Sequence, residues 1–154
     1  MTDAERPSFE GAPVSATLLY RIAAVVFVLF AVGHTLGFLS FRPSSPDGMA
    51  VYDAMNSVQF EFSGAQFTYA KFYTGFGLTV TVYMVFSALL AWHLGAVAAT
   101  QPRTIVALAW AFAATQFACL ILSVLYFFVV PIVFSGAVVV CLAWAAWLVD
   151  RAGT

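Results

Sequence analysis

Most of this 154-residue chain consists of four long apolar runs, which extend from Leu18 to Phe41, from Phe72 to Ala98, from Thr104 to Phe128 and from Pro131 to Val149. A helix rises about 1.5 Å per residue, so each run is long enough to cross a hydrocarbon core of roughly 30 Å. None of the runs carries an acidic side chain in its interior. The pattern predicts an all-α integral membrane protein, a four-transmembrane-helix bundle with spans at about 18–41, 72–98, 104–128 and 131–149.

The composition is typical of an integral membrane protein. Hydrophobic residues make up 63% and charged residues 8% of the sequence, whereas about 25% of a typical soluble domain is charged. So little polar length separates the runs that we expect one four-span domain over residues 18–150 and no separate soluble domain. Residues 1–17 contain two prolines but no basic region typical of a secretory signal, and we expect them to form a retained, flexible tail.

The distribution of basic residues predicts the orientation in the membrane. Four spans place both termini on one side, and that side carries four of the six basic residues, Arg6, Arg21, Arg103 and Arg151. Basic residues favour the cytoplasmic side, so we expect a multi-pass protein of the cell inner (cytoplasmic) membrane with cytoplasmic N- and C-termini. Aromatic residues near the span ends on this side predict an interfacial belt, formed by Tyr20, Trp92, Trp144 and Trp147.

The first connection, residues 42–71, is far longer than a turn requires, and long loops are usually functional or disordered. Ser45-Pro46-Asp47 has the composition of a helix start and predicts a short amphipathic helix on the outer surface. Val51, Met55, Val58 and Phe62 recur at helical spacing, whereas residues 58–63 alternate between apolar and polar, so an extended segment competes with a continuation of the helix there. Ser63 and Gln66 match a capping box, which would start the second span well before Phe72.

The motif Gly33-His34-Thr35-Leu36-Gly37 in the first run is the sharpest local anomaly. Gly33 and Gly37 form a GxxxG pair, which lets another helix approach closely. His34 lies inside the hydrocarbon and must find a partner, so it is a candidate ligand-binding or catalytic residue. The other interpretation is structural: a neutral imidazole that bonds a backbone carbonyl or a hydroxyl.

Matching depths across the bilayer predicts the neighbours of His34. Thr79 and Ser123 should lie at its level and can form hydrogen bonds, and Gln116 should lie about one turn deeper. None of these supplies a carboxylate, so acid-base chemistry would require Glu61 or Asp53 of the outer loop to fold over the bundle. Two further candidates stand at the start of the second run, Lys71 and Tyr73, because a lysine there can snorkel to head groups or bind a ligand carboxylate.

Other site classes find little support in the sequence. His93, the second histidine, should lie roughly 20 Å from His34 along the bundle axis, so we expect neither a metal site nor a cofactor. No run of Lys or Arg exists, and we expect no nucleic-acid partner. We expect Cys119 and Cys141 to be buried packing residues. Their similar depths in the membrane would also allow a disulfide between them.

Small residues recur at spacings typical of helix packing. Gly75 and Gly77 open the second run, and the third carries alanines at spacings of four, three and four, namely Ala107, Ala111, Ala114 and Ala118. Such residues allow close helix contacts, whether with an internal helix or with another protein.

The Gly33–Gly37 motif, together with Phe60-Glu61-Phe62-Ser63-Gly64 and the stretch from Phe72 to Gly77, resembles a small family of four-helix bacterial membrane proteins. The resemblance covers most of the chain and implies the fold alone, because no activity is assigned to that family. Two other four-helix classes fit less well. The glutathione-dependent membrane enzymes need arginines inside the bundle, and the vitamin K epoxide reductases need a CxxC motif.

The leading functional hypothesis is a non-catalytic membrane protein, either a small accessory subunit of a larger complex or a self-associating bundle in the lipid bilayer. The alternative is an enzyme or carrier for a lipid, quinone or other apolar small molecule, with a site near His34 and the outer loop. A channel or transporter ranks third, because no row of polar residues follows the full depth of any run.

Overall fold

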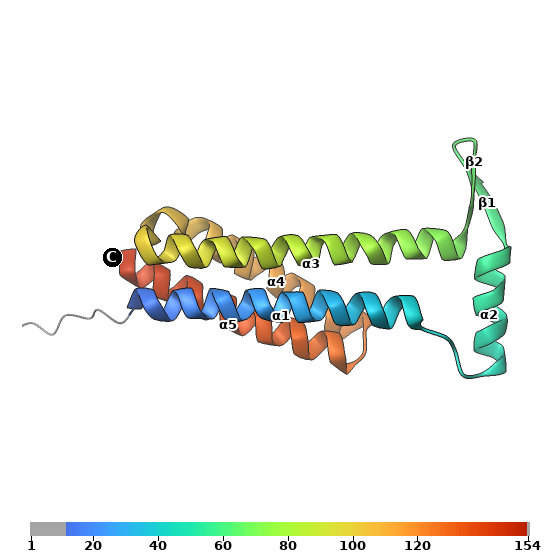
Figure 1. Cartoon of the computed structure of the whole chain (residues 1–154), viewed down its shortest axis with the longest axis horizontal. Helices are drawn as coiled ribbons and strands as arrows, with labels where there is room; N and C mark the ends of the chain where they lie inside the picture. Colours follow the sequence, from blue (N-terminus) through green and yellow to red (C-terminus); the bar gives the residue numbers. More distant parts are fainter. Residues whose placement is uncertain (1–11, 154) are drawn as a thin grey trace, which may run out of the picture. The chain divides into compact units, whose positions relative to one another are not determined.

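The computed structural model describes residues 12–153 (Figure 1). Four of its helices are long and apolar enough to span a membrane: α1 (Ala12–Ser40), α3 (Tyr69–Thr100), α4 (Val106–Tyr126) with the short 3-10 helix η1 (Pro102–Ile105) before it, and α5 (Val129–Gly153). The expected all-α four-helix membrane fold is confirmed.

The helix ends differ from the sequence limits by a few residues. Helix α1 begins at Ala12, so residues 12–17 are helical rather than part of a tail, while residues 1–11 lie outside the described part of the chain. Helix α3 begins at Tyr69, where the Thr68 hydroxyl accepts the Lys71 backbone N–H at 3.2 Å. Helix α4 ends at Tyr126 because Phe127 turns to extended backbone.

The outer surfaces of these helices are strongly apolar. The best window of each span is only 22% to 33% buried inside the chain, and large side chains such as Leu36, Val82 and Leu125 are about two-thirds exposed. Contiguous apolar surface of this extent is incompatible with water. The chain is therefore suited to a lipid bilayer, as a multi-pass membrane protein.

The described chain divides into two compact units. The terminal unit combines the chain up to Phe27 with the chain from Ser87 onward, and the loop unit is Val28–Phe86. Helices α1 and α3 each contribute one part to each unit. The expectation of a single domain over residues 18–150 stays a prediction.

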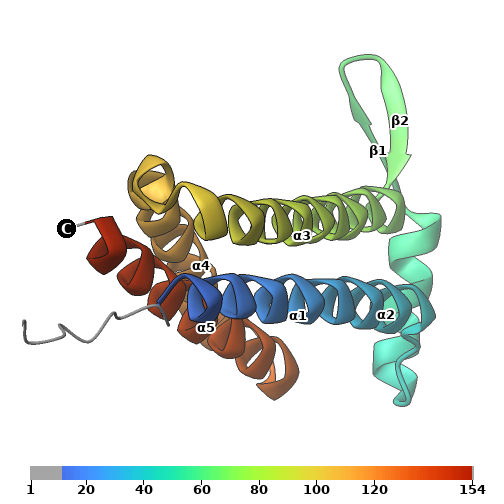
Figure 2. The same ribbon diagram turned by 60° about the vertical axis from the view of Figure 1, so that its left-hand side comes forward.

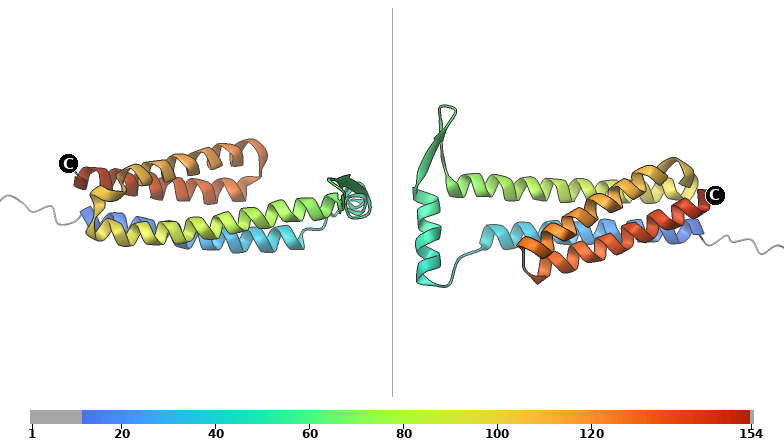
Figure 3. Two further views of the ribbon diagram at one scale, coloured as in Figure 1. Left: turned by 90° about the horizontal axis from the view of Figure 1, so that it is seen from above. Right: turned by 180° about the vertical axis from the view of Figure 1, so that it is seen from behind.

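In the terminal unit, α4 and α5 lie side by side along their length (Figure 3). Pro102 begins the turn that leads from α3 into α4, at the helix position where a proline costs no hydrogen bond. The core is built from fully buried large side chains separated by alanines, and the largest are Tyr20, Leu94, Val138, Leu142 and Val149. Small residues between them let the helices approach closely.

In the loop unit, α2 (Pro46–Ser57) runs across the ends of α1 and α3 (Figure 1). The predicted start is confirmed: the Ser45 side chain accepts the Gly48 N–H, Pro46 occupies the first turn and Asp47 follows. The Arg42 guanidinium lies 4.6 Å from the Tyr52 ring centroid and ties the preceding segment to this helix.

A β-hairpin follows α2 and projects beyond the start of α3 (Figure 2). Strands β1 (Gln59–Phe62) and β2 (Ala65–Thr68) pair antiparallel, with Phe62 opposite Ala65. The two turn residues, Ser63 and Gly64, both have positive φ, at 52° and 81°, as a two-residue hairpin turn requires. The capping-box prediction for Ser63 and Gln66 is wrong, because Ser63 is a turn residue and Gln66 lies in β2.

Candidate functional site

His34 uses its side chain to join two helices of the loop unit. Its Nε2 lies 3.1 Å from the Gly77 carbonyl oxygen, so Nε2 carries the proton and donates. The imidazole is half-buried and stacks on Phe38 one turn later, with ring centroids 5.7 Å apart and planes 3° apart. The geometry matches the structural interpretation of His34, an imidazole that bonds a backbone carbonyl.

A second polar contact lies beside the first. The Thr35 hydroxyl is 2.7 Å from the Ala31 carbonyl oxygen and 2.8 Å from the Thr81 hydroxyl. Thr35 donates to Ala31, and the single Thr81 proton has two acceptors within reach, the Thr35 oxygen and the Gly77 carbonyl oxygen at 3.3 Å. Both hydroxyl protons therefore have acceptors inside the loop unit.

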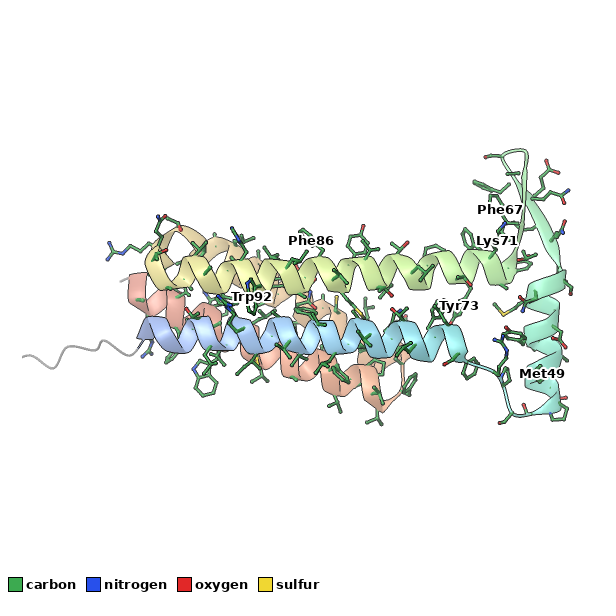
Figure 4. All side chains as sticks on the ribbon, in the orientation of Figure 1. Met49, Phe67, Lys71, Tyr73, Phe86 and Trp92 are labelled. Atoms are coloured by element: carbon green, nitrogen blue, oxygen red, sulfur yellow. The ribbon has the colours of Figure 1, made fainter. Side chains whose placement is uncertain are left out.

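Gly77 is the point on which these contacts depend. A Cβ built there would overlap the Phe38 ring, with the Cε1 atom only 2.6 Å away. The absence of a side chain therefore lets α1 approach the α3 backbone closely enough for His34 to reach the carbonyl. Tyr73, one turn earlier, lies between α3 and α1 (Figure 4), with its ring centroid 5.3 Å from that of Phe38.

The other predicted ligand residues of the loop unit do not converge on His34. Thr79 is exposed and donates to the Gly75 carbonyl oxygen at 2.9 Å. Lys71 is exposed at the start of α3, beside the hairpin (Figure 4). The two carboxylates, Asp53 in α2 and Glu61 in β1, are also exposed, and within the described residues neither forms a hydrogen bond with His34.

The terminal unit holds the remaining candidates. Ser123 is buried and donates to the Cys119 carbonyl oxygen at 2.9 Å, while the Ser135 hydroxyl lies 3.2 Å from Ser123 Oγ and links α4 to α5. Gln116 is half-buried in α4. Both cysteines, Cys119 and Cys141, are free thiols, and the prediction that they are buried is wrong for Cys119, which lies on the exposed face of α4, while Cys141 is half-buried. Across the described residues, no group of three or more metal-ligating side chains gathers.

The small residues selected for helix packing face outward, apart from Gly77. A Cβ built on Gly33, Gly37 or Gly75 would meet no described atom within 4 Å. The alanine stripe of α4 is exposed at every position, namely Ala107, Ala111, Ala114 and Ala118. Instead, the buried face of this helix carries Ala109, Phe112 and Ala113. A packing role for the outward residues therefore requires a contact from outside their own unit.

The sequence analysis used Arg21 only to predict the orientation in the membrane, and the structure shows contacts of its side chain that were not predicted. Its guanidinium carbon lies 3.5 Å from the centroid of the Trp92 ring, and Trp92 extends from α3 toward α1 (Figure 4). The sequence places Arg21 and Trp92 near the same end of their runs, which allows such a contact but does not predict it. The belt prediction for Tyr20 is wrong, because this side chain is fully buried in the core.

The comparisons with known proteins are negative. No protein-family model, curated protein or solved structure matches the chain. The resemblance inferred from the sequence motifs thus stays a prediction, and the functional argument rests on the geometry alone.

Proposed function

We propose that the chain is a non-catalytic membrane protein that serves as an accessory or self-associating subunit of a membrane complex. The observation that carries the proposal is the open face of α1 at Gly33 and Gly37, where a Cβ added to either glycine would have no described atom within 4 Å. In a bilayer, helices associate by close van der Waals packing across such glycine pairs. Within the loop unit this surface is uncovered.

The polar groups near this face support the same proposal. Two hydrogen bonds join α1 to α3, from His34 to the Gly77 carbonyl oxygen and between the Thr35 and Thr81 hydroxyls. These bonds hold α1 and α3 together and so keep the glycine face in a defined orientation. Because these side chains are used in hydrogen bonds between α1 and α3, they support a structural role rather than the binding of a ligand.

The second part of the proposal concerns location. Three described arginines lie at span ends on the same side of the membrane as the chain termini, namely Arg21, Arg103 and Arg151. Their positive charge favours an inner membrane topology with cytoplasmic termini. The partners are the lipid bilayer and either a second copy of this chain or other membrane subunits.

Replacing both glycines with leucine tests the association face. The variant Gly33→Leu/Gly37→Leu meets no described atom of its own chain at the Cβ positions, so the monomer fold should be kept while the close approach of a partner helix is blocked. We expect cross-linked or native-mass assemblies to fall by about tenfold or more, as expected when ~1.4 kcal/mol of packing is lost.

Val32→Leu is the matched control, because Val32 is 53% exposed and lies about 100° around the helix from Gly33. This variant should assemble like the wild type. Equal assembly of all three proteins would show that the glycine face is not used.

The alternative function is a carrier or enzyme for an apolar small molecule that binds near His34. Substitutions of His34 distinguish it from the proposed function. Under our proposal, His34→Ala loses the bond to Gly77 and destabilises the protein by about 0.5–2 kcal/mol, the range for hydrogen bonds between membrane helices. His34→Gln, which can still donate, should recover part of this loss. If His34→Ala instead abolished binding or turnover of a lipid or quinone with thermal stability unchanged, the alternative would be correct.

A further inference from the structure

The terminal unit contains an arginine inside a membrane span. Arg21 lies five residues after the start of the candidate span Ala16–Ser40. Its Nε is buried and has no hydrogen-bond partner in the described part of the chain. Asp150 is the one acidic residue described in this unit, and its carboxylate accepts the Trp110 indole N–H at 3.3 Å. An arginine near the end of a span can reach the lipid head groups, and the described residues offer no carboxylate for it.

The guanidinium is held in a defined place. It lies over the Trp92 ring at 3.5 Å from the centroid, and its Nε is 3.7 Å from the position of a Cβ built on Gly95. Trp92 is half-exposed, which places the pair at the edge of the helix bundle of this unit. An arginine stacked on an indole keeps its planar N–H groups free to bind an anion in the plane of the guanidinium.

An apolar groove continues from this arginine along α1. It is shallow and open, with a volume of about 250 Å³, and its lining residues Arg21, Ile22, Val25 and Val26 all belong to α1. The arginine is thus the polar end of a surface whose other lining residues are aliphatic. A ligand that matches both parts has an anionic group attached to a hydrocarbon chain.

We propose that this groove is a phospholipid site, in which Arg21 binds the phosphate and the aliphatic residues contact the first part of an acyl chain. A phosphodiester offers two coplanar acceptor oxygens to the guanidinium fork, and such charge-assisted bidentate bonds are strong. Because Nε is buried and lies beside Gly95, the phosphate would be bound by the Nη N–H groups of the guanidinium. Trp92 positions the guanidinium and shields one of its faces.

The test is the retention of defined lipids by the full-length chain in mild detergent, measured by native mass spectrometry. The probes are phosphatidylglycerol, diacylglycerol with the same acyl chains, and inorganic phosphate. We expect the wild type to retain the phospholipid at least about tenfold more strongly than diacylglycerol, as is typical of bonds to charged groups. Inorganic phosphate at the same concentration should not displace it, because it lacks the chain that fills the groove.

Arg21→Gln should reduce phospholipid retention to the diacylglycerol level, and Arg21→Lys should give an intermediate loss because it keeps the charge without the fork. Arg103→Gln removes the same charge from an exposed position and should retain lipid like the wild type. An equal loss in Arg21→Gln and Arg103→Gln, or no loss in Arg21→Gln, would overturn the proposal.

A second variant covers the case in which Arg21→Gln fails to fold. Val25→Trp fills the groove without touching the charge and should also reduce retention by several-fold. Val32→Trp is its control, because Val25 and Val32 are both 53% exposed. Equal retention by the two tryptophan variants would exclude the groove as the acyl site.

Discussion

At the residue scale, His34 shows how the partner of a side chain decides its role. The sequence marks His34 as unusual, because an ionisable group in a span must be satisfied. Depth counting predicted Thr79 as its neighbour, whereas the structure uses Gly77 and places Thr81 against Thr35. Each residue rotates the side chain by about 100° around the helix, so an error of two residues moves a neighbour to another face. Sequence depth alone could not give that rotation.

Gly77 provides the sharpest test at this scale. Gly77→Ala introduces a Cβ that overlaps the Phe38 ring, so we expect a loss of about 1–3 kcal/mol, as for overpacking in a core. Gly75→Ala is the matched control two residues earlier, where a Cβ meets no described atom within 4 Å. It should be neutral, or stabilising by up to about 1 kcal/mol from helix propensity.

Unfolding of the two variants by heat or by a denaturing detergent measures this difference. If both alanine variants unfolded at the same midpoint, the close contact between Phe38 and Gly77 would not exist in the membrane protein.

At the element scale, the four spans and the start of α2 could be predicted, and the hairpin could not. Helix formation in the long apolar runs and at Ser45-Pro46-Asp47 depends on residues close together in the sequence. The spans and the start of α2 can therefore be predicted from the sequence. Residues 58–63 carried two competing patterns, a continuation of the α2 periodicity and an alternation. The pairing of β1 with β2 decides between them, and that contact lies outside any local window.

Substitutions at the hairpin turn test whether the β1–β2 pairing forms. Gly64 has a φ of 81° although its surroundings are open, so Gly64→Val strains the backbone by roughly 1–2 kcal/mol without any clash. We expect amide hydrogen exchange across residues 59–68 to accelerate by about tenfold, while α1 and α3 keep their protection. Gly64→Asn should exchange like the wild type, because asparagine tolerates this conformation. Equal exchange in the valine and wild-type proteins would mean that the turn is not formed.

At the scale of the whole molecule, the sequence could not separate inward from outward small residues. The exposed Ala111 and the buried Ala109 and Ala113 lie within one turn of α4 and have the same chemistry. In a soluble protein the polar face of a helix would mark the outside, but here both faces are apolar because lipid replaces water. The packing of the terminal unit shows which alanines are internal to that unit and which face out of it.

The same ambiguity explains why Arg21 could not be identified as a binding residue from the sequence. Its position near the start of a span is typical of a snorkelling residue. Only the folded terminal unit brings the guanidinium onto Trp92 and beside the groove at Val25. Contacts between helices that are far apart in the sequence cannot be derived from either helix alone.

The central claim is that this chain functions as a subunit of an assembly, and the mass of the particle extracted from its own membrane tests it most directly. The measurement is native mass spectrometry after extraction in mild detergent, with the 16.6 kDa chain mass as reference. We predict a particle that contains at least one further polypeptide, either a second copy or another membrane protein. A strictly monomeric particle with no co-purifying polypeptide would contradict the claim.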